Sequence, residues 1–246
     1  MRNFLLITIF LLSSSCFSED LAEYHVFLCE ENFESVKDKI VESKVKNIEV
    51  AYFDTQKLEL IKSGLIIRVR LRPDKKRSDL TLKIRKDSND KITNSKKCEY
   101  DYYFSKNKYS CSWKKKISHQ VAKTILHSKV NILDYLSQEQ MELLKSITNT
   151  NNLNLNKFGN VKSQRYDIAD GSQGEDWTVE YWPFENGRNL IEISFKNDTK
   201  DHADSMKSLE EYISRHRLNK CQKDISKTSY TLNYFLPSIS NSLLKR

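Results

Sequence analysis

The sequence predicts an α+β fold in which an antiparallel sheet packs against helices. Several segments alternate apolar residues with polar or charged ones, and this period of two is typical of strands with one apolar face. Other segments repeat apolar residues at helical spacing. Hydrophobic residues make up 38% of the 246 residues, which is enough for a sizeable core. The alternating segments are 65–72, 80–85, 99–104, 177–182 and 191–196.

Helical spacing marks four further segments. In the first of them, Phe33, Val36 and Ile40 would share one face of a helix. Residues 137–140, with the sequence Ser-Gln-Glu-Gln, read as a capping box that begins a helix. The segments expected to be helical are 30–46, 115–128, 132–147 and 202–218.

The first 18 residues are predicted to be a secretory signal peptide. Arg2 precedes an apolar run, residues 4–12, and small residues follow, a layout too short to span a bilayer. Cleavage after Ser18 would leave an exported domain, residues 19–246, in the periplasm or outside the cell. A lipid anchor on Cys16 is the alternative to a soluble mature chain. No other segment is long and apolar enough to cross a membrane, and the asparagine-rich stretch 148–156 is expected to join two halves of the domain.

The mature chain would contain an even number of cysteines, which an exported protein can pair in disulfides. Cys98 and Cys111 flank a predicted hairpin turn, so this pair is favoured over the other pairings. Four free buried thiols are the alternative. No cysteine or histidine spacing indicates a zinc site. The four cysteines are Cys29, Cys98, Cys111 and Cys221.

The net charge of +8 points to an anionic partner. Nucleic acid is not expected, because no RNA-binding signature or zinc finger is present. Arg72 is interpreted as a solvated charge beside a turn. The lysines at 114–116 are interpreted as the exposed start of a helix, with recruitment of an anion as the alternative.

The charged faces of the strands allow two arrangements. In an open sheet they would face water. In a closed sheet they would line a tunnel, and the cations Arg68, Arg70, Lys83 and Arg85 would converge and need a polyanion to neutralise them. Acids in the same tunnel could hold Mg²⁺ or Mn²⁺, which favour oxygen ligands. The acids on these faces include Glu99, Asp101, Glu180 and Glu192.

The residues Tyr52-Phe53-Asp54-Thr55, followed by Gly64 and by Arg68-Val69-Arg70, resemble the CYTH superfamily of triphosphate tunnel metalloenzymes. Later stretches follow the order of that family's motifs, and the resemblance covers nearly the whole mature chain. These stretches are 81–85, 97–101, 165–166, 177–180, 192–194 and the closing lysine segment 227–230.

The resemblance implies an eight-stranded antiparallel barrel around a tunnel, with helices packed outside. In this family basic residues grip a triphosphate, and acids hold the divalent cation, Mg²⁺ or Mn²⁺. Carried over by position, the phosphate-binding residues would be Arg68, Arg70, Lys83, Arg85, Arg165 and Lys227. The metal-binding residues would be Glu23, Glu99, Asp101, Glu180 and Glu192.

The first strand departs from the family's E-x-E-x-K pattern. Glu23 matches the first acid, but His25 replaces the second and Phe27 replaces the lysine. Ser194 likewise replaces an acid of the later E-I-E strand. We therefore expect weakened metal binding and catalysis. His25 is interpreted either as a nitrogen ligand for Mn²⁺ or zinc, or as an ordinary packed side chain.

Three functions are compatible with this resemblance. The first is an exported metal-dependent phosphohydrolase of inorganic or organic triphosphates. The second is a catalytically inactive tunnel that binds a polyanion such as polyphosphate. The third is a nucleotidyl cyclase.

Overall fold

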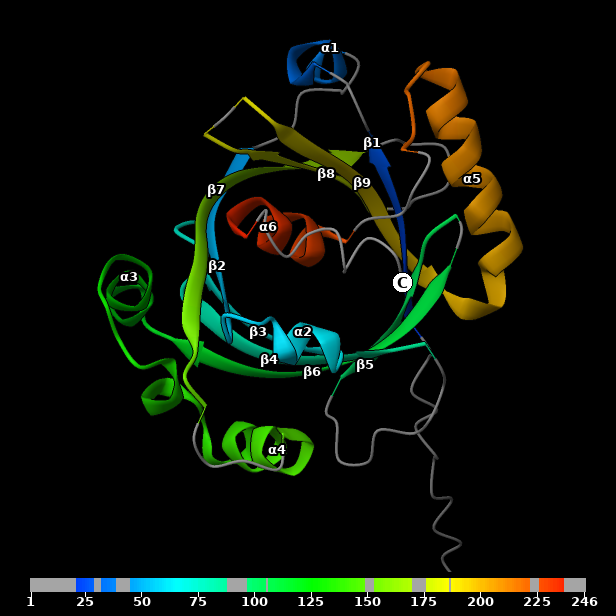
Figure 1. Cartoon of the computed structure of the whole chain (residues 1–246). Helices are drawn as coiled ribbons and strands as arrows, with labels where there is room; N and C mark the ends of the chain where they lie inside the picture. Colours follow the sequence, from blue (N-terminus) through cyan, green and yellow to red (C-terminus); the bar gives the residue numbers. More distant parts are fainter. Residues whose placement is uncertain are drawn as a thin grey trace, which may run out of the picture.

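The strands form one closed barrel. The computed structural model describes residues 21–28, 32–38, 45–87, 97–104, 106–148, 153–169, 176–185, 187–221 and 226–236. Within these residues nine strands close in the order β1-β5-β6-β4-β3-β2-β7-β8-β9, one strand more than expected (Figure 1). All neighbours pair antiparallel except β1 and β5, which run parallel. The strands are β1 (Leu21–Leu28), β2 (Val45–Asp54), β3 (Leu65–Leu71), β4 (Ser78–Lys86), β5 (Cys98–Tyr102), β6 (Asn107–Ile117), β7 (Asn156–Ala169), β8 (Asp176–Pro183) and β9 (Asn189–Asp198).

Closure gives every strand an outer and an inner face. The apolar residues of β3 and β4, such as Ile67 and Leu82, pack outward in one cluster with residues of the helices that follow β6. Those of β1, β8 and β9, such as Val26 and Ile193, form a second outer cluster. The charged residues between them therefore point into the barrel. Of the two arrangements considered from the sequence, the closed one is confirmed.

Most predicted helices form on the outside of the barrel, with shifted ends. Figure 1 shows α3, α4 and α5 outside the ring of strands. Among the described residues of the predicted helix 30–46, only five are helical, in α1, because from Val45 the chain pairs with β7 as strand β2. Residues 115–117 likewise end strand β6 instead of beginning a helix. The helices are α1 (Phe33–Lys37), α2 (Glu59–Lys62), α3 (His119–His127), η1 (Ile132–Tyr135), α4 (Gln138–Thr148), η2 (Thr199–Asp201), α5 (His202–Arg215) and α6 (Lys227–Phe235).

Helix α6 was not predicted, and it lies inside the ring of strands in Figure 1. Its buried Leu232 belongs to a cluster with the inner-face residues Tyr52 and Trp182. At Gly159 the register of β7 against β2 shifts, the backbone φ is +88°, and a Cβ would come within 3.3 Å of the Phe235 ring. This glycine therefore suits both the bulge and the close approach of α6. The helix fills part of the tunnel and carries Lys227 into it.

The YFDT segment ends β2 in a buried turn that Asp54 holds together. The Asp54 carboxyl group accepts hydrogen bonds from the backbone N–H groups of Thr55, Leu60 and Ile61, at 2.7, 2.9 and 2.9 Å. These bonds satisfy donors at the start of the short helix α2. Gly64 follows with φ +75°, and its carbonyl accepts from the Arg85 N–H at 2.8 Å. The turn thus connects β2 with β3 and holds the end of β4.

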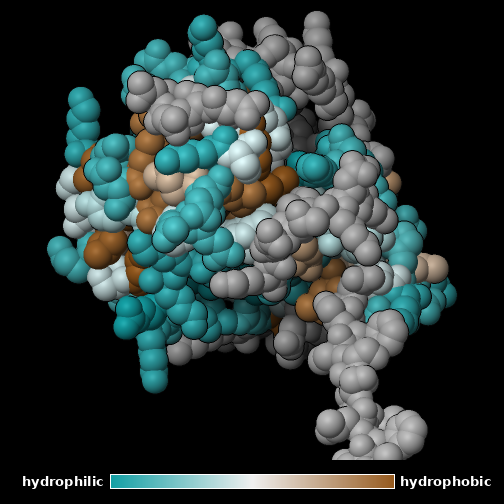
Figure 2. Space-filling view, turned by 90° about the horizontal axis from the view of Figure 1, so that it is seen from below, coloured by the Kyte–Doolittle hydropathy of each residue, from teal (hydrophilic) through white to brown (hydrophobic). Residues whose placement is uncertain are grey.

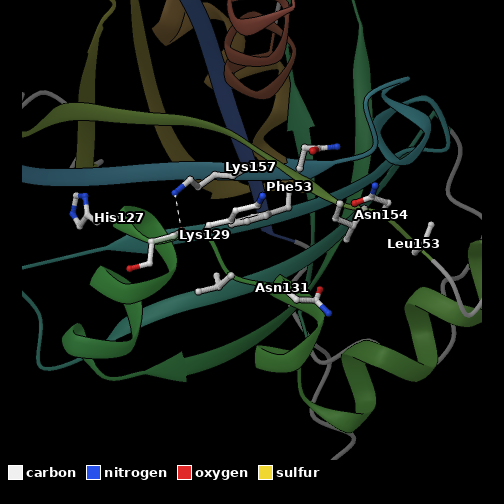
Figure 3. Close-up of a pocket in the computed structure, with 11 residues that line it drawn as sticks. Phe53, His127, Lys129, Asn131, Leu153, Asn154 and Lys157 are labelled. Carbon is white, nitrogen blue, oxygen red and sulfur yellow. Dashed lines mark hydrogen bonds between the residues drawn. The ribbon is translucent and has the colours of Figure 1, made fainter.

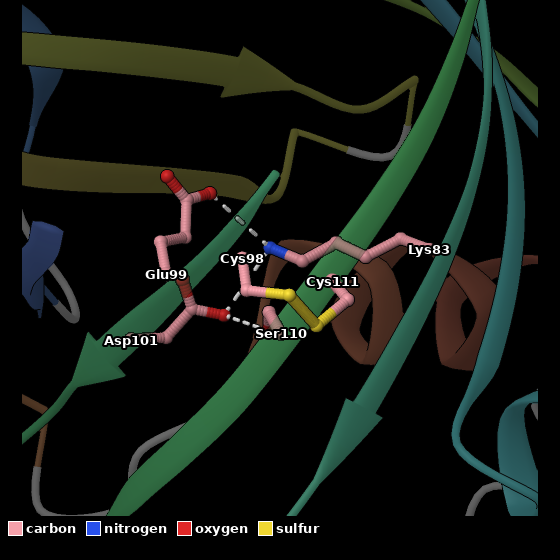
Figure 4. The surroundings of a disulfide bond; sticks show 6 residues. All are labelled: Lys83, Cys98, Glu99, Asp101, Ser110 and Cys111. Atoms are coloured by element: carbon pink, nitrogen blue, oxygen red, sulfur yellow. Dashed lines mark hydrogen bonds and ion pairs between the residues drawn. A yellow bond between two sulfur atoms is a disulfide. The ribbon is translucent and has the colours of Figure 1, made fainter. Parts of the chain in front are cut away.

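A disulfide between Cys98 and Cys111 joins β5 to β6, as predicted (Figure 4). The two residues are direct cross-strand partners. Because side chains alternate, Glu99 and Asp101 on β5 and Ser110 on β6 face the tunnel on either side of this bond. The disulfide therefore fixes the register of the short strand that carries two of the predicted metal-binding acids.

Several sequence predictions fall outside the described residues. The signal peptide, Cys16 and Cys29 lie there, as do residues 149–152 of the predicted linker. Cys221 is disulfide-bonded. None of the helices in the described part of the chain combines the length and apolar character that a membrane span requires.

We expect Asp54→Ala to lower the free energy of unfolding by about 2–4 kcal/mol, because three backbone donors would lose a buried acceptor. Asp54→Asn keeps one acceptor oxygen, so it should cost less. Urea unfolding of the three proteins measures the difference. Equal stability of wild type and Asp54→Ala would contradict a structural role for these bonds.

Candidate functional site

The inner face of the barrel carries two groups of opposite character. We call the first the basic group, which consists of Arg68, Arg70, Arg72 and Lys114 around Asp79. The second, the acidic group, consists of Glu23, Asp101, Glu180 and Glu192 around His25. Strands β3, β4 and β6 supply the basic group, and β1, β5, β8 and β9 supply the acidic group. Each group can be built from its contacts.

The basic group has more cations than acids. Both oxygens of the Asp79 carboxylate contact an arginine. Arg70 Nε lies 3.0 Å from one oxygen, and Arg72 Nε lies 3.1 Å from the other. The Thr81 hydroxyl donates to the same carboxylate at 3.1 Å. Arg68 Nε is buried and has no hydrogen-bond partner among the described residues. One carboxylate therefore serves this group, and Arg68 is left without an acid in the described part of the chain.

The electrostatics of the basic group show this excess charge. Burial, with repulsion from Arg68, lowers the pKa of Arg70 to about 10. Burial and the charge of Arg70 lower the pKa of Lys114 to about 8. Cations whose charge is disfavoured in this way are stabilised when an anion binds between them. The basic group therefore has the properties of an anion site.

His25 lies at the centre of the acidic group and is only 4% exposed. Its Nε2 is 3.7 Å from a Glu23 oxygen and 3.7 Å from Asp101 Oδ1, and its Nδ1 is 3.4 Å from a Glu192 oxygen. Burial alone lowers the pKa of His25, but the carboxylates of Glu23 and Glu192 outweigh it and raise the pKa to about 9. The ring stacks on Tyr103 with centroids 4.9 Å apart. This contact holds the plane of the imidazole.

Asp101 is fully buried and uses its two oxygens differently. Oδ2 accepts from Lys83 at 3.3 Å and from Ser110 at 2.6 Å (Figure 4). An Arg85 guanidinium nitrogen lies 2.9 Å from the same oxygen. Burial raises the pKa of Asp101, but Lys83 and Arg85 hold it well below its usual range. Oδ1, the oxygen nearest His25, has no hydrogen-bond partner. Lys83 and Arg85, predicted to bind phosphate, thus contact an acid in this structure.

Lys227 of α6 neutralises the other end of the acidic group. Its ammonium group donates to Glu180 at 2.7 Å and to Glu192 at 2.6 Å. Burial lowers the pKa of Lys227, but these two carboxylates outweigh it and raise the pKa. Arg165 adds a longer contact to Glu180, 3.6 Å. Lys227 and Arg165 therefore lie with the acids and not in the basic group.

A divalent cation would find three ligand atoms beside His25. One atom each of Glu23, His25 and Asp101 lie within 4.8 Å of one another. Both ring nitrogens of His25 and Asp101 Oδ1 are buried, and none of them has a hydrogen-bond partner in the part of the chain that the structure describes. Buried polar atoms of this kind are rare unless a ligand satisfies them. These three residues therefore fit a metal ion.

The structure brings the predicted site residues together in part. Glu23 and Asp101 belong to the metal-compatible trio. The other predicted ligands lie outside that trio: Glu99 contacts Lys196, and Glu180 and Glu192 contact Lys227. Their metal role stays a prediction. Of the phosphate-binding candidates, Arg68 and Arg70 lie in the basic group.

The sequence reasoning missed Arg72 and Lys114 as tunnel residues. Arg72 was interpreted as solvated, but its guanidinium contacts Asp79. Lys114 was assigned to the start of a helix, but it lies on β6 opposite Thr81. The alternation of Arg68, Arg70 and Arg72 was the signal that could have placed Arg72 on the inner face.

Apart from the tunnel, a hollow lies outside the barrel, between the end of α3 and the start of β7 (Figure 3). It has a volume of about 870 Å³ and is lined by Phe53, His127 and Lys157 among others. The Lys157 ammonium group donates to the carbonyls of Leu126 and Ser128, so its charge stabilises the end of α3. This hollow does not bring predicted site residues together.

Solved structures with a similar fold were found by comparison. A protein from Hippeastrum, named as an adenylyl cyclase and described with a dominant triphosphatase activity, matches with a TM-score of 0.62 and 14% identity over 88% of this chain and 97% of that one. A protein from Bacillus halodurans, also named as an adenylate cyclase, matches with a TM-score of 0.54 and 16% identity over 86% and 97%. No protein-family model and no curated protein matches the sequence. At these identities the likeness concerns the fold alone: the chain shares its barrel fold with these two solved proteins.

Proposed function

We propose that the tunnel binds the triphosphate group of an inorganic or organic triphosphate and supports its hydrolysis with a divalent cation. The observation that carries this proposal is the basic group, in which Arg68 has a buried, unpartnered Nε beside Arg70, Arg72 and Lys114. Cations gathered in a tunnel of low dielectric are best compensated by a ligand with several negative charges. A linear triphosphate supplies such charges along one chain.

The chain's own residues would perform the steps around the phosphate. Arg68 and Arg70 would grip non-bridging oxygens, since a guanidinium can donate two parallel hydrogen bonds to a phosphate. Their fixed charges would also stabilise the negative charge that develops during phosphoryl transfer. Lys83 and Arg85 hold the Asp101 carboxylate in place, which leaves its Oδ1 directed at the trio.

The divalent cation would be held by Glu23, His25 and Asp101. When bound, such an ion polarises a phosphoryl oxygen or activates water. The trio lies on β1 and β5, and β5 pairs with β6, which supplies Lys114 to the basic group. A phosphate chain between the two groups would meet guanidinium groups on one side and the acids on the other.

A binding protein without turnover is the second candidate, and the first strand favours it. Phe27 is buried in an apolar cluster at the position where the resemblance expects a lysine. Lys227 is engaged by two carboxylates, which removes it from the phosphate side. The tunnel would then bind a polyanion such as polyphosphate. A nucleotidyl cyclase activity has no separate support in the geometry.

Export is part of this proposal. Disulfides persist in oxidising compartments and are rare in the cytosol. The Cys98–Cys111 bond therefore supports the secretory signal predicted at residues 1–18. The periplasm and the cell exterior are both compatible with it.

We expect the protein to bind tripolyphosphate in EDTA and to release phosphate from it when Mn²⁺ or Mg²⁺ is added. Arg68→Gln should weaken binding by about 10- to 100-fold, because a charge-assisted hydrogen bond contributes roughly 1.5–3 kcal/mol. Lys207→Gln, which removes a cation from the outer helix α5, should bind like wild type. Isothermal titration calorimetry and a phosphate-release assay measure the two quantities.

The outcomes separate the candidates. Binding with turnover supports the hydrolase, and binding without turnover under any divalent cation supports the polyanion-binding protein. If wild type does not bind tripolyphosphate, or if Arg68→Gln and Lys207→Gln bind equally well, the basic group is not an anion site and both candidates are wrong.

The affinity for tripolyphosphate should also depend on Lys114. Its pKa is lowered to about 8, so Lys114 is charged below pH 8 and loses its charge as the pH rises through that value. Arg70, with a pKa of about 10, keeps most of its charge there, and Asp79 stays ionised because the neighbouring positive charges lower its pKa. We therefore expect wild type to lose about tenfold in affinity between pH 7 and pH 9, relative to Lys114→Arg, which remains charged. Parallel pH profiles for the two proteins would contradict this role.

A further inference from the structure

The imidazole of His25 is the least expected group in the tunnel. It occupies a position on β1 where the resemblance expects a carboxylate. It is 4% exposed, lies between three acids and makes no hydrogen bond to a described residue through either nitrogen. A packed structural histidine would normally donate or accept through at least one ring nitrogen. The carboxylates contact the ring as ion pairs at 3.4–3.7 Å, and a divalent cation bound here would take the place of the ring proton that these contacts stabilise.

The surroundings of His25 are built to present its nitrogens. Tyr103 stacks on the ring with an interplanar angle of 15°, which fixes the direction of Nδ1 and Nε2. Nε2 faces Glu23 and Asp101 Oδ1, at 3.7 Å from each. Across the strand pair the partner of His25 is Ser194, a small residue in place of an acid. The ligand atoms are thus directed toward a common point without being bonded to one another.

The two carboxylates of the trio are oriented by other residues. Asp101 is held through Oδ2 by Lys83, Arg85 and Ser110, so Oδ1 remains available. Glu23 contacts Lys196 at 3.4 Å. Supporting contacts of this kind position the ligands of metal centres. The trio therefore has a preformed arrangement.

We infer that Glu23, His25 and Asp101 form a site for an imidazole-preferring divalent cation, such as Zn²⁺ or Co²⁺, in preference to Mg²⁺. Mg²⁺ is a hard ion that favours oxygen ligands and keeps its waters, whereas imidazole suits transition-metal ions. The exchange of a carboxylate for His25 thus changes which metal the tunnel selects. The inference deepens the proposed function and rests on it for the role of the metal in turnover.

The test measures metal binding with no triphosphate present. Metal-stripped full-length protein is titrated calorimetrically with ZnCl₂ and with MgCl₂. His25→Gln should weaken Zn²⁺ binding at least about tenfold, since even indirect changes around a metal ligand cost roughly 10- to 100-fold. His25→Glu creates an all-oxygen trio and should lower the ratio of Zn²⁺ to Mg²⁺ affinity. His127→Gln, which changes a histidine paired with Glu49 on the outer side, should match wild type.

A spectroscopic readout identifies the nitrogen ligand directly. Pulsed electron paramagnetic resonance of the Mn²⁺-loaded protein should show coupling to an imidazole nitrogen in wild type and in His127→Gln, and no such coupling in His25→Gln. Circular dichroism confirms that each variant is folded. Unchanged Zn²⁺ affinity in His25→Gln, a nitrogen coupling that survives this substitution, or absence of metal binding in wild type would each overturn the inference. Tripolyphosphate binding in EDTA is measured separately, so the metal site and the anion site can fail independently.

Discussion

Closure of the sheet is the constraint on which the rest of this structure depends. Once β1 pairs with both β9 and β5, the polar face of every strand turns toward a shared interior. Ionic groups that would be solvated on an open sheet are then partly removed from water, which costs free energy unless each is paired. The ion pairs inside the tunnel offset this free-energy cost.

The acidic group and the basic group offset this desolvation cost in different ways. In the acidic group, lysine side chains neutralise the carboxylates: Lys83, Lys196 and Lys227 each contact one. On the basic side Asp79 is shared by two arginines, and Arg68 has no acid among the described residues. A folded chain can tolerate such an imbalance where a ligand completes the site. The excess of cations in the basic group therefore points to a bound anion, which the fold alone does not indicate.

The sequence predicted much of this arrangement and missed specific parts of it. Alternation in segments 65–72 and 80–85 was sufficient to place Arg68 and Lys83 on polar faces, because side-chain direction in a strand has a period of two. It could not show whether those faces turn inward, since closure depends on pairing between β1 and β5, which are far apart in the chain. Helix α6 was missed because residues 227–235 are rich in threonine and aromatic residues, and their helix is stabilised by the Ser226 cap and by burial of Leu232.

The first strand shows how charge requirements can be met from different places in a sequence. Phe27 pairs directly with Glu192 across β1 and β9, at the position where the resemblance expects a lysine. Glu192 is buried and needs a cation, and Lys227 supplies one at 2.6 Å from α6. The aromatic ring of Phe27 belongs to the same apolar cluster as Leu232 of that helix. The packing of Phe27 against Leu232 thus favours the placement of the helix whose Lys227 neutralises Glu192.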